Sequence, residues 1–163
     1  EAKMRCETLS FSRPIVELAV GFYTRVGDPL IAATDATALA GKRVCRSEEG
    51  WLPDLLPGSD GAQLSTAATA EECFDRLRRG EADVVNLVRE RAETAIHRVG
   101  FGEAVAEIPG LRAIRTLHAV AMKGNAAGEE ALARIDLGIE RIMLSGNWFE
   151  VVVAHRSQFA ALW

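Results

Sequence analysis

The alternation of strand-like and helix-like segments between residues 43 and 108 is the feature that most restricts the fold. Short runs at 43–46, 63–67, 82–88 and 104–108 have the length and composition of strands. Helical patterns follow two of them and are closed by Gly80 and Gly100, and a capping box at 69–72 starts the first helix. This order predicts an α/β fold with a mostly parallel sheet and right-handed crossovers.

Two longer extended segments, 14–26 and 111–122, flank this α/β unit. Two crossings, into and out of one α/β unit, are the layout of a hinged two-lobe protein. Shorter helical stretches are predicted at 35–40 and 51–56. Apolar residues at helical spacing predict a long helix over 128–144, and Asn147 can cap a final helix over 148–155.

Composition excludes several functional classes. The net charge is −4 and the basic residues do not cluster, so no nucleic-acid partner is expected. No apolar run of membrane-spanning length and no signal peptide is present; the first residue is Glu1, as expected of a processed or truncated chain. The three histidines are isolated and no Cys-x-x-Cys pair occurs, which predicts no metal and no cofactor.

The chain has three cysteines. Cys45 ends a predicted strand and Cys73 lies in the next element but one, so the two are plausible neighbours. A disulfide between them is predicted, which would agree with an oxidising compartment. The alternative is a pair of small buried apolar residues, because free cysteine packs in that way. Cys6 would remain unpaired or bond elsewhere.

Several motifs occur in an order that resembles one family. The motifs are Arg5 with Phe11-Ser12-Arg13-Pro14, Leu39-Ala40-Gly41-Lys42-Arg43-Val44, the stretch 73–85, the stretch 117–125, Gly138-Ile139-Glu140-Arg141-Ile142 and Ser145-Gly146-Asn147-Trp148. Together they resemble the amino-acid-type (family 3) periplasmic solute-binding proteins of ABC transporters, which have the type 2 periplasmic-binding fold.

The resemblance implies a division of the chain into three segments. Residues 1–26 would be part of lobe one and the first hinge strand, 27–110 a complete α/β lobe two, and 111–163 the return hinge strand and the C-terminal helices of lobe one. The N-terminal part of lobe one has no counterpart in this sequence. The expected fold is therefore one complete α/β lobe, two hinge strands and a partial second lobe.

The resemblance also implies ligand-binding residues. Arg5 matches the arginine that holds a ligand carboxylate, which a guanidinium binds with two parallel hydrogen bonds; the alternative is an ordinary surface arginine. Ser12 comes from the Phe-Ser-x-Pro segment. In lobe two, the segment between a strand and a helix start supplies candidates because ligands bind at the carboxyl ends of such strands. These candidates are Ser47, Glu49, Gly50 and Trp51, with Asn86 on a later strand; Trp51 could equally anchor its own short helix.

One position departs from the family. Val88 stands where the family often has an aspartate that binds the ligand's α-amino group, which puts an ordinary α-amino acid ligand in doubt. A carboxylate-bearing ligand or a cationic ligand of another kind fits as well.

The predicted function is a non-enzymatic, periplasmic or extracellular protein that captures a small polar, carboxylate-bearing ligand between two lobes and delivers it to an ABC-transporter permease. The alternatives are the sensor domain of a signalling protein and a dehydratase-like enzyme on the same fold. No nucleophile–base pair supports the enzyme. A homodimer that covers exposed sheet edges is a further possibility.

Overall fold

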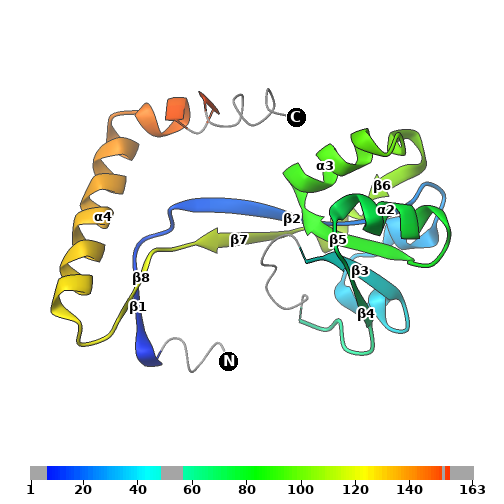
Figure 1. Cartoon of the computed structure of the whole chain (residues 1–163), viewed down its shortest axis with the longest axis horizontal. Helices are drawn as coiled ribbons and strands as arrows, with labels where there is room; N and C mark the ends of the chain where they lie inside the picture. Colours follow the sequence, from blue (N-terminus) through cyan, green and yellow to red (C-terminus); the bar gives the residue numbers. More distant parts are fainter. Residues whose placement is uncertain (1–6, 49–56, 152, 155–163) are drawn as a thin grey trace. The chain divides into compact units, whose positions relative to one another are not determined.

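The computed structural model describes residues 7–48, 57–151 and 153–154, and the chain divides into two compact units (Figure 1). Unit 2 is the continuous stretch 18–115, and unit 1 combines 1–17 with 116–163. Two strands, β2 (Val16–Arg25) and β7 (Ala113–Leu117), contain the points at which the chain passes from one unit to the other. The predicted helix at 51–56 lies outside the described residues.

Unit 2 is built on a sheet with the strand order β4-β3-β5-β2-β6, and β7 also pairs with β2. The remaining strands are β3 (Arg43–Ser47), β4 (Gln63–Ala67), β5 (Val84–Val88) and β6 (Val105–Glu107). Strand β3 is parallel to both β4 and β5, whereas β2 is antiparallel to β5 and β6. The expected mostly parallel α/β sheet is confirmed, with β2 as the strand of opposite direction.

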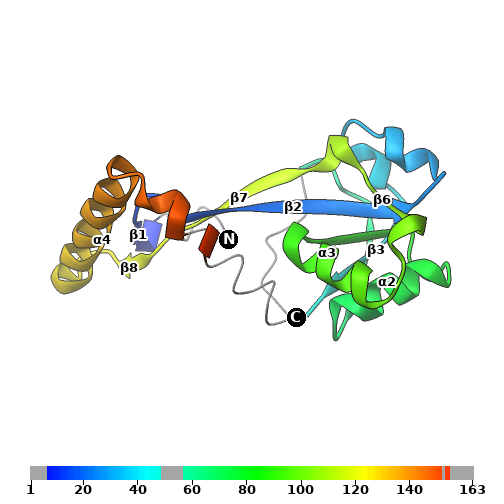
Figure 2. The same ribbon diagram turned by 90° about the horizontal axis from the view of Figure 1, so that it is seen from above.

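Neighbouring residues along these strands point to opposite faces and so build two cores. Tyr23, Cys45 and Val85 belong to the core under α2 (Ala70–Arg78) and α3 (Arg89–Arg98). Their chain neighbours Phe22, Val44 and Val84 face the other core, which the short 3-10 helices η1 (Pro29–Ala32), η2 (Ala36–Leu39) and η4 (Pro109–Leu111) line. Figure 2 shows α2 and α3 on one side of the sheet and the η1–η2 segment on the other. A short η3 (Gly102–Ala104) precedes β6.

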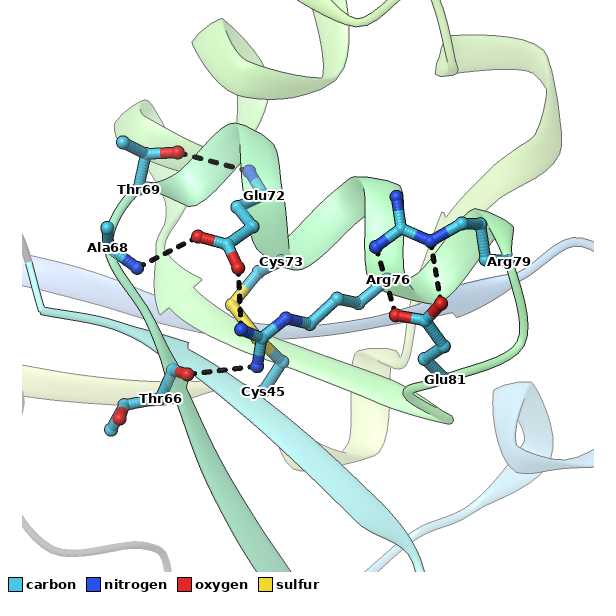
Figure 3. Close-up of polar contacts among 9 residues, drawn as sticks. All are labelled: Cys45, Thr66, Ala68, Thr69, Glu72, Cys73, Arg76, Arg79 and Glu81. Carbon is cyan, nitrogen blue, oxygen red and sulfur yellow. Dashed lines mark hydrogen bonds and ion pairs between the residues drawn. A yellow bond between two sulfur atoms is a disulfide. The ribbon is translucent and has the colours of Figure 1, made fainter.

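Helix α2 is fixed to the sheet at its first turn (Figure 3). The Thr69 hydroxyl accepts a hydrogen bond from the Glu72 amide at 3.1 Å, as the predicted capping box requires. The Glu72 carboxylate accepts from the Ala68 amide, one residue earlier than in the standard box. The next residue, Cys73, forms a disulfide with Cys45 of β3, and both cysteines are fully buried. The predicted disulfide is confirmed.

The start of β5 is bound to the start of β3 by one carboxylate. Asp83 accepts three hydrogen bonds from Arg43, from its backbone amide at 2.9 Å and its guanidinium at 3.1 and 2.7 Å. The carbonyl of Asp83 accepts a fourth bond from the Thr24 hydroxyl of β2. Hydrogen bonding to Arg43 holds the pKa of Asp83 at about 2, below its ordinary value of 3.8. One residue therefore holds three strands in register.

We expect Asp83→Asn to lower the free energy of unfolding at pH 7 by on the order of 1 kcal/mol, since the half-exposed Arg43 lets solvent screen the pair. The folded-state pKa is depressed, so this stabilisation is present above pH 4 and is lost as the pH falls towards 2. Urea unfolding of both proteins at several pH values measures the difference. A difference that stays constant between pH 4 and pH 2 would contradict the assigned role.

Unit 1 contains a two-stranded antiparallel sheet and one long helix. Strand β1 (Leu9–Phe11) pairs with β8 (Val120–Met122), and α4 (Ala126–Leu144) packs on β8. Asn125 caps α4 by accepting from the Gly128 amide. The helix begins two residues before the predicted start at 128. Helical backbone follows at 147–151 and 153–154, where a helix over 148–155 was predicted, so the helix already includes Asn147, the predicted cap.

The prediction of one continuous strand over 111–122 was wrong. The segment starts in η4 and then splits into β7 and β8, which belong to different sheets. The break lies at His118 and Ala119. His118 donates from Nδ1 to the Ser12 carbonyl at 2.7 Å, and the Ala119 amide donates to the Ser12 hydroxyl at 3.0 Å. Backbone bonds on either side, from the Ser12 amide to Ala119 and from the Ile15 amide to Leu117, leave His118 between them, so the pairing is irregular at the break.

Candidate functional site

The carboxyl ends of three parallel strands meet at one edge of the unit 2 sheet. Ser47, the last residue of β3, pairs with Ala67, the last residue of β4, and the following Glu48 amide donates to the Ala67 carbonyl at 2.8 Å. On the other side of β3, strand β5 ends at Val88. Ligands in α/β proteins bind beyond such strand ends, so this edge is the candidate site.

The structure describes three of the seven predicted site residues, Ser12, Ser47 and Asn86. Arg5, Glu49, Gly50 and Trp51 lie outside the described residues, and their roles remain predictions. Ser47 lies at the edge itself and is buried. Glu48 is exposed beside it.

Asn86 lies two residues inside the sheet rather than at its edge. It is 2% exposed, and its Nδ2 donates to the Gly21 carbonyl of β2 at 3.1 Å. Asn86 pairs with Phe22 in the ladder, so its side chain connects β5 with β2 along the same strand pair. This contact gives Asn86 a structural task, and its contact with a ligand stays a prediction.

Ser12 belongs to unit 1. Its hydroxyl donates to the Arg13 carbonyl at 2.7 Å and accepts from the Ala119 amide at 3.0 Å. The residue is 5% exposed. The hydroxyl thus already makes one bond as donor and one as acceptor, and its predicted role towards a ligand remains open.

The two helices that start near the candidate edge differ at their N-termini. At α2, the Thr69 hydroxyl accepts from the first-turn amide of Glu72, and the Glu72 carboxylate accepts from the amide of Ala68 before the helix, as Figure 3 shows. The N-cap of α3 is Val88, which offers no side-chain hydrogen bond. Since a helix N-terminus favours negative charge, the α3 end of this edge suits an anionic group better than an amine.

A cluster of charged residues next to Val88 was not found by sequence reasoning. Arg89 donates from Nη2 to the Glu107 carboxylate at 2.8 Å, and Arg112 donates to the same carboxylate at 2.9 and 2.7 Å. Hydrogen bonds from Arg112 and then Arg89 lower the pKa of Glu107, although burial opposes the shift. Two guanidinium groups around one carboxylate leave a net positive charge. Of these three residues, only Arg89 could have been suspected from the sequence, because it directly follows Val88.

Tyr23 is paired with Glu107 in the ladder between β2 and β6. Its side chain is 4% exposed, and among the described residues its hydroxyl has no hydrogen-bond partner. Burial, and then the negative charge of Glu107, raises the pKa of Tyr23 to about 12. The hydroxyl lies over Gly21, where an added Cβ would come within 2.6 Å of it. Tyr23 therefore remains neutral at physiological pH. Its ring occupies the space that a side chain at position 21 would need, so this position requires glycine.

The described parts of the chain contain neither a candidate metal site nor a candidate membrane-spanning helix. Within 7–48, 57–151 and 153–154, no group of three or more His, Cys, Asp or Glu side chains could hold a metal ion. No helix in those ranges is long and apolar enough to cross a membrane.

Solved structures share this arrangement over almost the whole chain. A mutant of ArgBP from T. maritima superimposes with a TM-score of 0.66 and 18% identity over 92% of this chain. The fold is that of the periplasmic binding proteins. AbpA from Streptococcus pneumoniae, an amino acid ABC transporter substrate-binding protein bound to L-arginine, matches this periplasmic-binding-protein fold with a TM-score of 0.62, at 16% identity and over 94% of the chain.

A histidine kinase sensor domain with similarity to periplasmic binding proteins also matches, with a TM-score of 0.64, 17% identity and 93% of this chain covered. The chain spans only 62–64% of the length of these three structures. No family model and no curated protein matches the sequence. The periplasmic-binding-protein fold is thus shared by transport proteins and a sensor. Sequence identities this low do not allow the ligands of those proteins to be assigned to this chain.

Proposed function

We propose that the protein captures a small polar, carboxylate-bearing ligand without converting it and delivers it to an ABC-transporter permease, from a periplasmic or extracellular location. The observation that carries the proposal is the shared fold, which covers 92% of this chain in a binding protein from T. maritima. The candidate edge of unit 2, with Ser47 at the end of β3, supplies one part of the ligand site.

Charge at the edge supports a ligand with a carboxylate. Val88 offers no carboxylate to an ammonium group, and the next residue is the cationic Arg89, which α3 holds at its first position. Arg89 is anchored by Glu107 and lies near a helix N-terminus that favours anions. Arg5 is proposed as a second contact to a ligand carboxylate, by its resemblance to the family's arginine. The ligand class proposed is therefore a compound with more than one anionic group, such as a dicarboxylate.

A thermal-shift screen tests the proposal with dicarboxylates, opines, amino acids and polyamines. A ligand present at a hundred times its Kd stabilises the folded state by about 2.7 kcal/mol, which raises the Tm by several degrees. We expect Arg5→Ala to abolish this shift. Arg134→Ala is the matched control, since Arg134 is exposed on α4 and paired with Glu130, and it should leave the shift unchanged.

Three results would contradict the proposal. Chemical turnover of a stabilising compound would establish an enzyme. Equal shifts in wild type and Arg5→Ala would remove Arg5 from the site. Stabilisation by polyamines alone would assign a cationic ligand.

A sensing role is the second candidate, and the match to a histidine kinase sensor domain favours it. Ligand capture would then control a signalling partner instead of a permease. The thermal-shift result is the same for both roles. Pull-down with ligand-loaded protein separates them, because a permease or a kinase would be recovered. A second copy of the chain is a further proposed partner.

A further inference from the structure

One aspartate of unit 2 differs from the other aspartates that the structure describes. The carboxylates of the other five are each bound by another residue: Asp28 by the Leu30 amide, Asp35 by Thr37, Asp75 by Arg78, Asp83 by Arg43 and Asp136 by the Arg13 amide. Asp60 is exposed, and its carboxylate makes no hydrogen bond or ion pair with any described residue. No contact therefore fixes the side chain of Asp60 in one orientation.

Asp60 is followed by Gly61 in a tight turn. The Ala62 amide donates to the Ser59 carbonyl at 3.1 Å, and Gly61 has a φ of 85°. Residues 59–62 therefore form a type II turn with Asp60 at its second position. Gly61 is exposed as well. Because glycine has no Cβ, its backbone nitrogen can approach the side chain of the preceding residue without a steric clash.

A backbone nitrogen next to an unbound carboxyl group can close a five-membered ring. The nitrogen of Gly61 attacks Cγ of Asp60; a Cγ–N bond forms, the bond from Cγ to its hydroxyl breaks, and the amide proton leaves with the hydroxyl as water. Water then adds to the main-chain carbonyl of this succinimide and breaks the bond from that carbonyl carbon to nitrogen. The chain now runs through Cγ of residue 60, which has become an isoaspartate with a free α-carboxylate. The net reaction is an isomerisation and consumes no other reactant.

We propose that the Asp60–Gly61 bond is a site of spontaneous isomerisation to isoaspartate in the folded protein. The attack requires rotation about the Cα–C bond of Asp60, which opens the turn bond between Ala62 and Ser59. No bond of the Asp60 carboxylate has to break as well. Asp35 is also exposed, but its carboxylate accepts from the backbone amide and from the hydroxyl of Thr37. Both of these bonds must break before Asp35 can react.

Isomerisation in this turn affects the sheet of unit 2, because the turn leads into β4. The Gly61 carbonyl accepts from the Gly41 amide at 2.8 Å, and the Gln63 amide donates to the Lys42 carbonyl at 2.8 Å. These bonds begin the parallel pairing in which Arg43 is opposite Gln63. Isoaspartate adds one carbon atom to the main chain, so the Gly61 carbonyl is displaced from the Gly41 amide. The modified protein loses the first bonds between β3 and β4.

Ageing of the purified chain at neutral pH tests the proposal. Isoaspartyl methyltransferase transfers a methyl group to the isoaspartyl carboxylate, and mass spectrometry of proteolytic peptides locates the label. The rates of labelling at Asp60 and Asp35 are measured in the folded chain and in the chain unfolded by urea, where local sequence alone sets their ratio. We expect the ratio of the Asp60 rate to the Asp35 rate to be about tenfold larger in the folded chain, since the Thr37 bonds slow Asp35 only there.

Asp60→Glu is the matched variant. It keeps the charge, but its longer side chain has to close a six-membered ring, so the label at residue 60 should disappear. In the labelled fraction of the unaltered chain, the amides of Gly41 and Gln63 should exchange with deuterium faster than in fresh protein. A folded chain that stays unlabelled at Asp60 while the unfolded chain is labelled would overturn the proposal. Equal rate ratios in the folded and unfolded chains, or unchanged exchange at both amides, would also overturn it.

Discussion

Replacing both Cys45 and Cys73 with alanine is expected to lower the free energy of unfolding of unit 2 by about 3 to 4 kcal/mol. The disulfide joins residues 28 positions apart, and opening a loop of this length restores chain entropy to the unfolded state. The lost link connects β3 to α2, so the two main layers of unit 2 are affected together. Urea unfolding followed by circular dichroism gives the difference.

The wild type, unfolded and refolded with an excess of a dithiol, serves as the matched control for this double variant. It retains both sulfur atoms and lacks only the bond, so it separates the covalent contribution from the loss of side-chain volume. A variant within about 1 kcal/mol of the oxidised wild type would show that the disulfide does not hold unit 2 together.

Gly110→Ala is expected to destabilise unit 2 by about 2 to 4 kcal/mol. A Cβ at this position would lie 2.2 Å from the carbonyl oxygen of Ala33 and 2.7 Å from the Cα of Thr34. Both atoms belong to the backbone next to η1, which cannot move without disturbing the core that Leu30 and Leu111 share. The glycine is therefore required by the close approach of η4 to η1.

Gly102→Ala is the control for this prediction. It lies in η3 of the same unit, and the nearest atom to its added Cβ is a methyl group of Ile96 at 3.8 Å, an ordinary contact. Its stability should stay within about 0.5 to 1 kcal/mol of wild type. If Gly110→Ala and Gly102→Ala lowered the free energy of unfolding equally, the close approach at Gly110 would not be the reason for the destabilisation.

Local patterns predicted most of unit 2. The strand at 43–46, the capping box at Thr69 and the glycine that ends α2 are each encoded within a few residues, and each was found. The Cys45–Cys73 disulfide was also predicted, because Cys73 lies in the next element but one after the strand of Cys45; Cys45 itself is in the middle of β3 and not at its end.

Contacts between distant residues could not be predicted in this way. At the break of the 111–122 segment, His118 bonds to Ser12, which is 106 positions away in the chain. The Arg89–Glu107–Arg112 cluster joins a helix start, a strand and a loop, and no periodicity relates them. Four of the predicted ligand residues lie outside the described residues, so their part of the candidate site rests on sequence alone.

Tyr23 is the single tyrosine of the chain. Its phenol lies in the core of unit 2 and ionises only at about pH 12 while the fold is intact, whereas an unfolded tyrosine ionises near pH 10. Ionisation to the phenolate shifts the near-ultraviolet absorption band of the ring to longer wavelength and strengthens it. Between about pH 10 and pH 12, the phenolate absorbance of Tyr23 should therefore rise when the core of unit 2 opens. This absorbance follows the unfolding of one of the two units without an attached dye.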